Sequence, residues 1–436
     1  MAVAGVPSIS SAERPEGLSR WVASCLGVAE VELREFRGGA GNAGYQVFVD
    51  GDDPVPKAFL RTALHPTGSS RLGYSLQREG VILRVAEGLG FPVAPVLGTL
   101  ADPDALLMGF VSGSARPDPA EVDKVAGKYL TLIAAVHAAD VTAFPVTQHA
   151  TLHGAVAADL AAWELEAADR GVATLPLIAL GARVLKERVP AGEGPPCLVH
   201  GDVGPGNFLA LDGEVTAILD WELAHLGDPH EDLAWLWMRG AHTNFGDPEA
   251  RFAEYETASG IGIDRPRLAW HVAFVMWKSV IALHGRLGVA RPGELAMVQL
   301  VVGLTYDALL GAQLVNLLGG SPLLGQSPLR ETTVEANLAE ELLGVAALED
   351  DQRVVVEYLR EAAALGPWLR SELDRDCALT LGVPPSGLLA HVRTCPAEQL
   401  LDAAQVLGRA ADRQAATSPK SVRRIERAQR IGLGAR

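Results

Sequence analysis

The sequence predicts an α+β protein of two lobes, followed by an additional helical block. Strand-like alternation and turn signals dominate residues 1–112, whereas helical periodicity dominates residues 113–320 and returns at 331–411. The 436 residues suffice for two or three lobes, and 48% hydrophobic against 21% charged residues indicates a globular chain. Residues 412–436 are predicted to be a basic tail, and its Gly-ended stretch 418–436 is expected to be frayed.

Composition and charge exclude several classes of protein. The net charge of −16 argues against nucleic acid as a main partner. Four scattered cysteines without a CxxC pair indicate neither a disulfide framework nor a zinc site, and fit a reducing compartment. The N-terminus lacks the features of a signal peptide. The most apolar stretch, 295–318, is interrupted by polar residues and is predicted to be a buried helix. We therefore expect a cytoplasmic protein without membrane contact.

The N-terminal lobe is predicted to begin with an amphipathic helix at 15–26, which Gly27 stops. A second helix is expected to start at a cap on Ser69 or Ser70 and to run to about residue 87. The predicted strands are 31–37, 45–49, 55–63, 93–100 and 105–111.

The second lobe is predicted to begin after a hinge at 113–119, which is rich in Gly, Pro and Ser. A short strand-like island around 198–220 interrupts its helices, and a loop at 319–328 separates it from the added block. The predicted helices are 120–139, 156–170, 178–189 and a series from about 231 to 318.

The strand-like island contains a predicted hairpin. Asp212-Gly213 between two apolar runs indicates a two-residue turn, which pairs Asn207 with Ile218. Asn207 and Asp220 then lie together at the open end of the hairpin. An amide oxygen beside a carboxylate suits Mg²⁺, so these two residues are the candidate metal ligands.

Asp202 lies in the loop that enters this hairpin, and it can reach the same place without binding the metal. There it could accept a hydroxyl proton and aim the oxygen at phosphorus, which makes it the candidate catalytic residue. The alternative is an ordinary surface hairpin whose carboxylates are turn residues and helix caps.

The combination of His200-Gly201-Asp202, Asn207 and Asp220 resembles the catalytic set of the aminoglycoside phosphotransferase family and, more distantly, of protein kinases. The run from Asp220 to Pro229, followed by Asp232-Leu233-Ala234, is most similar to the branch associated with acyl-CoA dehydrogenases. The resemblance implies a bilobal protein-kinase-like fold, with ATP or GTP as co-substrate, Mg²⁺ as cofactor and a small-molecule hydroxyl as acceptor.

The predicted N-terminal lobe also agrees with this resemblance. Its Gly-rich segment resembles the phosphate-covering loop of these enzymes, in the residues Gly38, Gly39, Gly41 and Asn42. Arg61 stands where kinases usually carry a phosphate-binding Lys, with Lys57 as the fallback, and Glu79 matches the partner of that basic residue. Met108 and Phe110 fall in a segment that resembles the adenine-binding hinge.

For several other polar residues, the sequence is compatible with two roles. His137 is predicted to be packed or to support the catalytic loop, and Asp228 and Asp232 either cap a helix or support that loop. Glu222 either touches metal or substrate or is solvated. The block at 331–411 could pack on the second lobe, cover the acceptor site or form an oligomer.

Three functional classes remain open from the sequence. The favoured one is a small-molecule kinase, because Gly227-Asp228-Pro229 follows Asp220 too soon to leave room for a peptide platform. The similarity of the 220–229 run favours a hydroxyacyl-CoA-like acceptor, and an aminoglycoside or another antibiotic is the alternative. The other classes are a catalytically silent nucleotide-binding module and a metal-dependent hydrolase.

Overall fold

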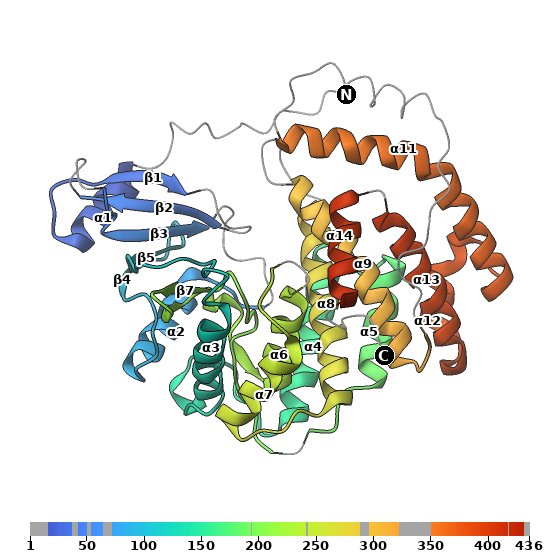
Figure 1. Ribbon diagram of the computed structural model, residues 1–436, viewed down its shortest axis with the longest axis horizontal. Helices are drawn as coiled ribbons and strands as arrows, with labels where there is room; N and C mark the ends of the chain where they lie inside the picture. Colours follow the sequence, from blue (N-terminus) through green and yellow to red (C-terminus); the bar gives the residue numbers. More distant parts are fainter. Residues whose placement is uncertain are drawn as a thin grey trace.

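The chain folds into a small sheet lobe and a larger helical body, which lie side by side in the computed structural model (Figure 1). The described residues are 16–36, 42–49, 54–63, 72–192, 194–240, 243–287, 296–321, 350–416 and 418–430. The sheet lobe, the helical lobe and the additional helices thus follow one another as the sequence predicts.

The first lobe is a five-stranded antiparallel sheet in the order β1-β2-β3-β5-β4. Helix α1 (Glu16–Leu26) packs on one of its faces through Leu18 and Val22. Helix α2 (Leu76–Gly88) packs on the other through Ile82 and Leu83. The strands are β1 (Glu32–Phe36), β2 (Asn42–Phe48), β3 (Ala58–Ala63), β4 (Val96–Leu100) and β5 (Ala105–Gly109).

Alternation along β3 decides where Arg61 lies. Successive side chains of a strand point to opposite faces. Leu60 belongs to the cluster under α1, whereas Phe59 packs toward the core on the α2 side. Arg61 therefore shares the α2 face with Phe59, as a residue facing Glu79 requires.

Helix α2 begins later than the sequence predicts. Ser75 is its N-cap, with its side chain accepting a hydrogen bond from the N–H of Arg78 (3.1 Å). The predicted caps Ser69 and Ser70 lie outside the described residues. Since each of the three serines could cap a helix, the sequence alone did not distinguish them.

The helical lobe surrounds short strands that carry the predicted chemistry. Its strands are β6 (Cys197–Val199), β7 (Phe208–Leu211), β8 (Glu214–Ile218) and β9 (His225–Gly227). Its helices are α3 (Val122–His137), α4 (Leu152–Asp169), α5 (Pro176–Glu187), α6 (Pro229–Arg239), α7 (Pro248–Ser259), α8 (Arg265–Leu287) and α9 (Ala296–Leu317). Helix α9 is the buried helix predicted at 295–318. Within the described ranges, every helix is too short or too polar to span a bilayer.

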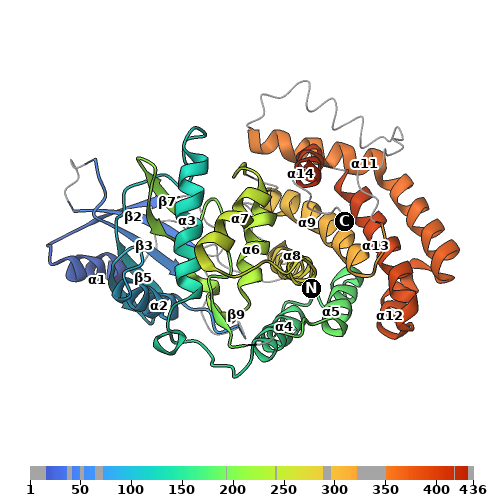
Figure 2. The ribbon, with the colours of Figure 1, turned by 60° about the horizontal axis from the view of Figure 1, so that its bottom comes forward.

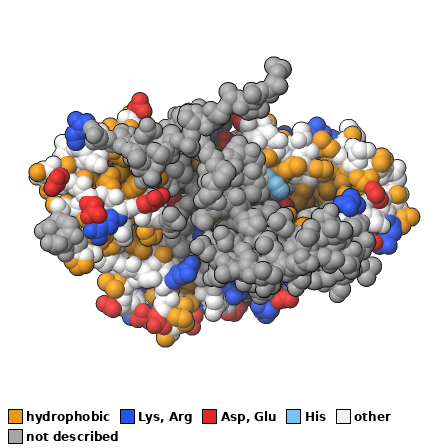
Figure 3. Space-filling model, turned by 90° about the horizontal axis from the view of Figure 1, so that it is seen from above, with side chains coloured by type: hydrophobic (Ala, Val, Ile, Leu, Met, Phe, Trp, Pro, Cys, Tyr) orange, Lys and Arg blue, Asp and Glu red, His pale blue; other side chains and the backbone are white. Residues whose placement is uncertain are grey.

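The additional helices are α11 (Asp350–Asp376), α12 (Leu388–Thr394), α13 (Leu400–Ala415) and α14 (Pro419–Arg430). Helices α11, α13 and α14 pack against α9, whereas α12 packs against α5 (Figures 1 and 2). Helices α9 and α13 meet at Gly311 and Gly408, where a Cβ on Gly311 would lie 2.6 Å from the Cα of Gly408. Seen from above, hydrophobic side chains gather in a hollow at the end of the molecule that carries these helices (Figure 3).

Residues 419–430 form helix α14, so the predicted frayed tail is wrong there, and α13 runs across the boundary predicted at 411/412. Ser421, Ile425 and Ala428 of α14 are buried. Their spacing puts them on one helix face, and that face packs on α9. The many arginines between them hid this short periodicity in the sequence.

Candidate active site

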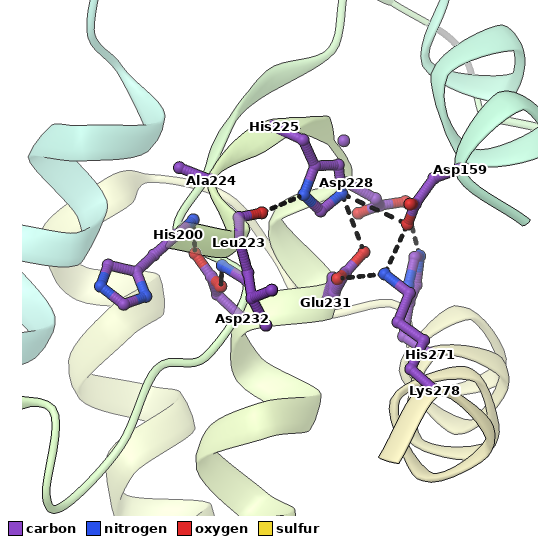
Figure 4. A network of polar contacts seen from close by, with 12 residues as sticks. Asp159, His200, Leu223, Ala224, His225, Asp228, Glu231, Asp232, His271 and Lys278 are labelled. Atoms are coloured by element: carbon purple, nitrogen blue, oxygen red, sulfur yellow. Dashed lines mark hydrogen bonds and ion pairs between the residues drawn. The ribbon is translucent and has the colours of Figure 1, made fainter. Parts of the chain in front are cut away.

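The loop between β6 and β7 carries Asp202, and a buried carboxylate supports it. Asp232 of α6 accepts hydrogen bonds from the backbone N–H groups of His200 (2.9 Å) and Gly201 (2.8 Å). His137 of α3 contacts the same carboxylate through Nε2 (2.9 Å). Figure 4 shows Asp232 beside His200. Of the roles left open by the sequence, His137 and Asp232 therefore support the loop.

Gly201 allows this loop to approach the segment that follows Asp220. Its φ of +83° is in the left-handed region, and a Cβ there would lie 2.8 Å from the carbonyl oxygen of Leu223. The loop carrying Asp202 and the segment 221–223 are therefore in direct backbone contact.

The Asp202 carboxylate has two partners. Asn207 Nδ2 donates to Asp202 Oδ2 (2.6 Å) and to the Asp202 carbonyl (2.8 Å). Arg239, the last residue of α6, donates from Nε to Oδ1 (2.8 Å) and from Nη2 to Oδ2. Burial lowers the pKa of Arg239, but the attraction of Asp202 outweighs burial and raises this pKa above its ordinary value. Arg239 could not be predicted from the sequence, because no local pattern links it to Asp202.

The β7–β8 hairpin has the predicted turn but a different register. Asp212 (φ 53°) and Gly213 (φ 74°) both have positive φ, as a type I′ turn needs. A bulge between Leu209 and Ala210 shifts the pairing, so that Ile218 faces Phe208 rather than Asn207. Asn207 still lies at the open end, where its carbonyl accepts from the N–H of Leu219 (2.9 Å).

Arg61 joins the two lobes. Its Nη1 donates to both carboxylate oxygens of Glu79 (2.7 and 2.9 Å), so the predicted contact between these residues is confirmed. Its Nη2 reaches Asp220 Oδ1 (3.2 Å) and Glu222 Oε2 (3.1 Å). We call Arg61, Glu79, Asp220 and Glu222 the inter-lobe cluster. Asn42, from β2, donates to Glu222 (3.4 Å), so Glu222 is not simply solvated.

The inter-lobe cluster has more negative than positive charge. Burial raises the pKa of Glu79 to about 7; Arg61 opposes this shift, and Asp220 and Glu222 add to it. Burial and the nearby Asp220 raise the pKa of Glu222. Three carboxylates around one guanidinium fit a divalent cation, and hard oxygen ligands suit Mg²⁺. Among the described residues, Asn207 Oδ1 accepts no hydrogen bond, so it can join Asp220 as a ligand.

Met108 and Phe110 stay predicted adenine-binding residues, since that prediction concerns their backbone groups and expects their side chains in the core. Met108 is a core residue of β5. Phe110 donates its backbone N–H to the carbonyl of Lys57 (3.2 Å), so this donor is already used within the lobe. Gly38, Gly39 and Gly41 lie outside the described residues.

A second set of charges supports the segment after Asp220. Lys278 of α8 donates to Glu231 Oε1 (2.7 Å) and to Asp159 Oδ2. His225 Nε2 lies 3.4 Å from an oxygen of each carboxylate. We call Asp159, His225, Glu231 and Lys278 the buried cluster; Figure 4 shows them pointing toward one another from four elements.

The buried cluster has ligand atoms close enough together to hold a metal. However, the Lys278 ammonium already stands between its carboxylates. Burial lowers the pKa of His225, but Asp159 and Glu231 outweigh burial and raise this pKa to about 9, so the ring adds a second positive charge. We therefore assign this cluster a structural role. Asp228 is the N-cap of α6, because its side chain accepts a hydrogen bond from the N–H of His230 (3.0 Å).

Curated relatives agree with the motif. The chain is 25% identical over 239 residues to acyl-CoA dehydrogenase family member 11 of Rattus norvegicus, covering 47% of this chain and 30% of that protein. It is 24% identical over 237 residues to acyl-CoA dehydrogenase family member 10 of Mus musculus, covering 50% and 22% respectively. The match thus spans less than a third of the length of either relative.

Solved structures with detectable similarity include a macrolide 2′-phosphotransferase from Brachybacterium faecium, at 19% identity and a TM-score of 0.45, covering 64% of this chain and 95% of that one. Another is an aminoglycoside phosphotransferase in complex with ADP and hygromycin B, at 17% identity and a TM-score of 0.45, covering 61% and 90%.

The sequence profile described as "Phosphotransferase enzyme family" (APH) matches residues 32–271. This range begins at β1 and ends within α8, so it includes Arg61, Glu79, Asp202, Asn207 and Asp220. The family resemblance predicted from the catalytic motif is confirmed, and the chain belongs to the phosphotransferase enzyme family.

Proposed function

We propose that the chain is a small-molecule kinase that transfers the γ-phosphoryl group of ATP or GTP to a hydroxyl. The observation that carries this proposal is the meeting of two parts from different lobes. Arg61 and Glu79 from the sheet lobe contact Asp220 and Glu222, and the loop that carries Asp202 lies against the segment 221–223.

Each residue has a role that its contacts permit. Asp202 would accept the proton of the acceptor hydroxyl and orient its oxygen. Asn207 and Asp220 would hold Mg²⁺, which supplies positive charge to the phosphate oxygens when it is bound. Arg61 would bind phosphate oxygens with the Nη2 donors that now reach Asp220 and Glu222.

For the acceptor, we propose an anionic, partly apolar molecule such as a hydroxyacyl-CoA. The similarity to acyl-CoA dehydrogenase family members supports this class. Arg239 is already paired with the Asp202 carboxylate through two hydrogen bonds, so this neutral pair does not by itself select the charge of the acceptor.

Phosphoryl transfer tests this function. Purified protein with Mg²⁺ and γ-labelled ATP is given hydroxyacyl-CoA thioesters or aminoglycosides, and labelled acceptor is separated from free phosphate. We expect labelled hydroxyacyl-CoA. Asp202→Asn should slow transfer roughly 10²–10⁴-fold while nucleotide binding stays nearly unchanged.

The alternatives give different results in the same assay. Labelled aminoglycoside with no labelled thioester would reverse the acceptor class. Phosphate release without any labelled acceptor would indicate a hydrolase. Nucleotide binding without any turnover would indicate a silent module.

A further inference from the structure

Arg78 links the sheet lobe to the segment that follows Asp220. It lies in the first turn of α2, and its guanidinium crosses to the helical lobe. Its Nη1 donates to the carbonyl of Glu222 (3.1 Å), and its Nη2 donates to the carbonyl of Ala224. The proposed function gives Arg78 no role, although this residue directly precedes Glu79 in the chain.

The position of Arg78 in α2 does not favour the helix itself. The N-terminus of a helix carries partial positive charge, so a cation in its first turn is repelled. The N-cap Ser75 already accepts a hydrogen bond from the N–H of Arg78 (3.1 Å), so the start of the helix does not need the guanidinium. An arginine at this position is therefore explained by what it contacts in the other lobe.

The carbonyls that Arg78 contacts lie at the end of a short 3₁₀ turn at residues 221–223. The last carbonyls of such a turn have no partner within it and need donors from elsewhere. Arg78 supplies them for the first and third carbonyls of residues 222–224. His225 Nδ1 contacts the middle one, that of Leu223 (2.9 Å; Figure 4). The backbone of this segment is thus held from both lobes.

A fixed segment matters because the backbone of Asp220 is strained. Its φ of +64° lies in the left-handed region, which a residue other than glycine keeps only where its surroundings hold it. On the preceding side, His200 Nε2 contacts the carbonyl of Leu219 (2.8 Å). On the following side, Arg78 and His225 hold the backbone. These contacts therefore decide where the carboxylate of Asp220 points.

Arg78 and Arg61 contact the same segment in different ways. Arg61 binds the carboxylates of Asp220 and Glu222, so these contacts must change when the proposed function engages Mg²⁺ and phosphate. Arg78 binds backbone carbonyls that are not among the proposed metal ligands, so its contacts can persist. Arg78 can then hold the segment to the sheet lobe while Arg61 turns toward the phosphates.

We propose that Arg78 is a positioning residue, which keeps Asp220 directed at the metal site when Arg61 releases the carboxylates. The inference rests on the proposed function, in which Asp220 is a ligand of Mg²⁺. The same contacts support the catalytic loop, because the carbonyl of Leu223 lies against Gly201.

Nucleotide binding with and without metal tests the inference without turnover. Calorimetry measures binding of a non-hydrolysable ATP analogue in saturating Mg²⁺ and again in EDTA. Arg78→Met removes two charge-assisted hydrogen bonds and keeps an apolar stem. Binding in Mg²⁺ should weaken roughly 10–100-fold, whereas binding in EDTA should change less than about twofold. A variant that merely folded poorly would lose both.

A double-mutant cycle distinguishes positioning from a separate contribution to binding. If Arg78 acts through Asp220, Arg78→Met combined with Asp220→Asn should bind in Mg²⁺ about as weakly as Asp220→Asn alone. Arg84→Met removes an exposed arginine from the same helix and should bind as the wild type does. Arg78→Lys keeps the charge but not the fork, so it should recover only part of the loss.

Hydrogen exchange gives a second readout that needs no nucleotide. In Arg78→Met, the amides of residues 221–225 should exchange faster than in the wild type, while those of α8 stay unchanged.

The inference is overturned if exchange in 221–225 is unchanged, if Arg78→Met loses affinity equally with and without metal, or if its loss adds to that of Asp220→Asn. A wild type whose nucleotide affinity does not depend on Mg²⁺ also overturns it, since Asp220 would then hold no metal. Failure of the proposed function looks different. In that case metal-dependent binding and exchange both depend on Arg78, but no hydroxyl acceptor becomes labelled in the transfer assay.

Discussion

The inter-lobe cluster and the buried cluster lie at opposite ends of the same segment, residues 220–231, and differ in how their charges balance. The inter-lobe cluster has three carboxylates and one guanidinium. The buried cluster has two carboxylates, one ammonium and one imidazole that is charged at neutral pH. The first therefore has excess negative charge, and the second is neutral overall.

The pKa values of the carboxylates reflect this difference in charge balance. Burial raises the pKa of Glu79 to about 7, since the single Arg61 cannot compensate three carboxylates. In the buried cluster, burial also raises the pKa of Glu231, but Lys278 and then His225 outweigh burial and lower it below its ordinary range. A site that awaits a cation and a site that already contains one are thus distinguishable by the direction of these shifts.

The exposed fractions of the side chains differ between the two clusters in the same sense. The side chains of Asp220 and Glu222 are 35% and 31% exposed, whereas those of Lys278 and Glu231 are 4% and 2% exposed. We infer that the first cluster is arranged to exchange ligands, and that the second fixes the segment from which Asp220 and Glu222 project.

Among the substitutions considered, removal of the Lys278 ammonium from the buried cluster should have the largest effect on stability. Lys278→Met leaves the buried Glu231 and the partly buried Asp159 without their ammonium partner, and breaking a buried pair typically costs about 3–5 kcal/mol of unfolding free energy. Urea denaturation measures the loss. Lys128→Met is the matched control, because Lys128 pairs with Glu214 on the surface, where the same change should cost less than about 1 kcal/mol. Equal losses in the two variants would contradict the structural role of the buried cluster.

The charge on His225 should make stability depend on pH. Its pKa is about 9 in the folded chain against 6.5 ordinarily, so the folded state binds the proton more tightly. The stabilisation is complete below pH 6.5 and is lost as pH rises through 9. It amounts to at most about 3 kcal/mol.

Denaturation curves at several pH values between 6 and 10 check this. His225→Gln should be less stable than the wild type at pH 6, and its unfolding free energy should depend much less on pH. His153→Gln, at an exposed histidine, should keep the pH dependence of the wild type. An unchanged slope in His225→Gln would assign the titration to another group.

Much of the site could be predicted because it is encoded locally. The Asp212-Gly213 turn brings Asn207 toward Asp220, and strand alternation turns Arg61 toward Glu79. These features depend on short intervals or on a periodicity that one segment carries. Even so, the bulge at Leu209 and Ala210 changed the register, since no residue type specifies it.

The features that the sequence did not reveal depend on contacts between distant segments. Arg239 reaches Asp202 only because α6 ends beside the catalytic loop. Lys278 meets Asp159 only where α8 crosses α4. The burial of one face of α14 depends on a partner helix, α9, that local charge density does not indicate.

At the inter-lobe cluster, a loss of one carboxylate charge should weaken metal-dependent nucleotide binding. Asp220→Asn removes a proposed ligand of Mg²⁺, and we expect about 100-fold weaker binding of Mg²⁺ with nucleotide, comparable to the loss from disturbing the surroundings of a metal ligand. Calorimetry with and without EDTA measures it. Asp212→Asn, at the turn of the same hairpin, should bind as the wild type does, since Asn tolerates positive φ. Equal binding by Asp220→Asn and wild type would place the metal elsewhere.

The smallest effect should come from Arg61→Lys, which keeps the charge of the inter-lobe cluster but removes the fork. One guanidinium contacts Glu79 through Nη1 and both Asp220 and Glu222 through Nη2. A single ammonium is a compact charge and cannot hold these two positions at once. We expect about 10-fold weaker nucleotide binding, which is less than the loss in Asp220→Asn because the positive charge remains. Arg34→Lys, on the exposed strand β1, is the control and should change nothing. If Arg61→Lys binds nucleotide normally while Lys57→Met does not, the phosphate-binding role belongs to Lys57, and the excess negative charge at Asp220 and Glu222 alone would account for the cation site.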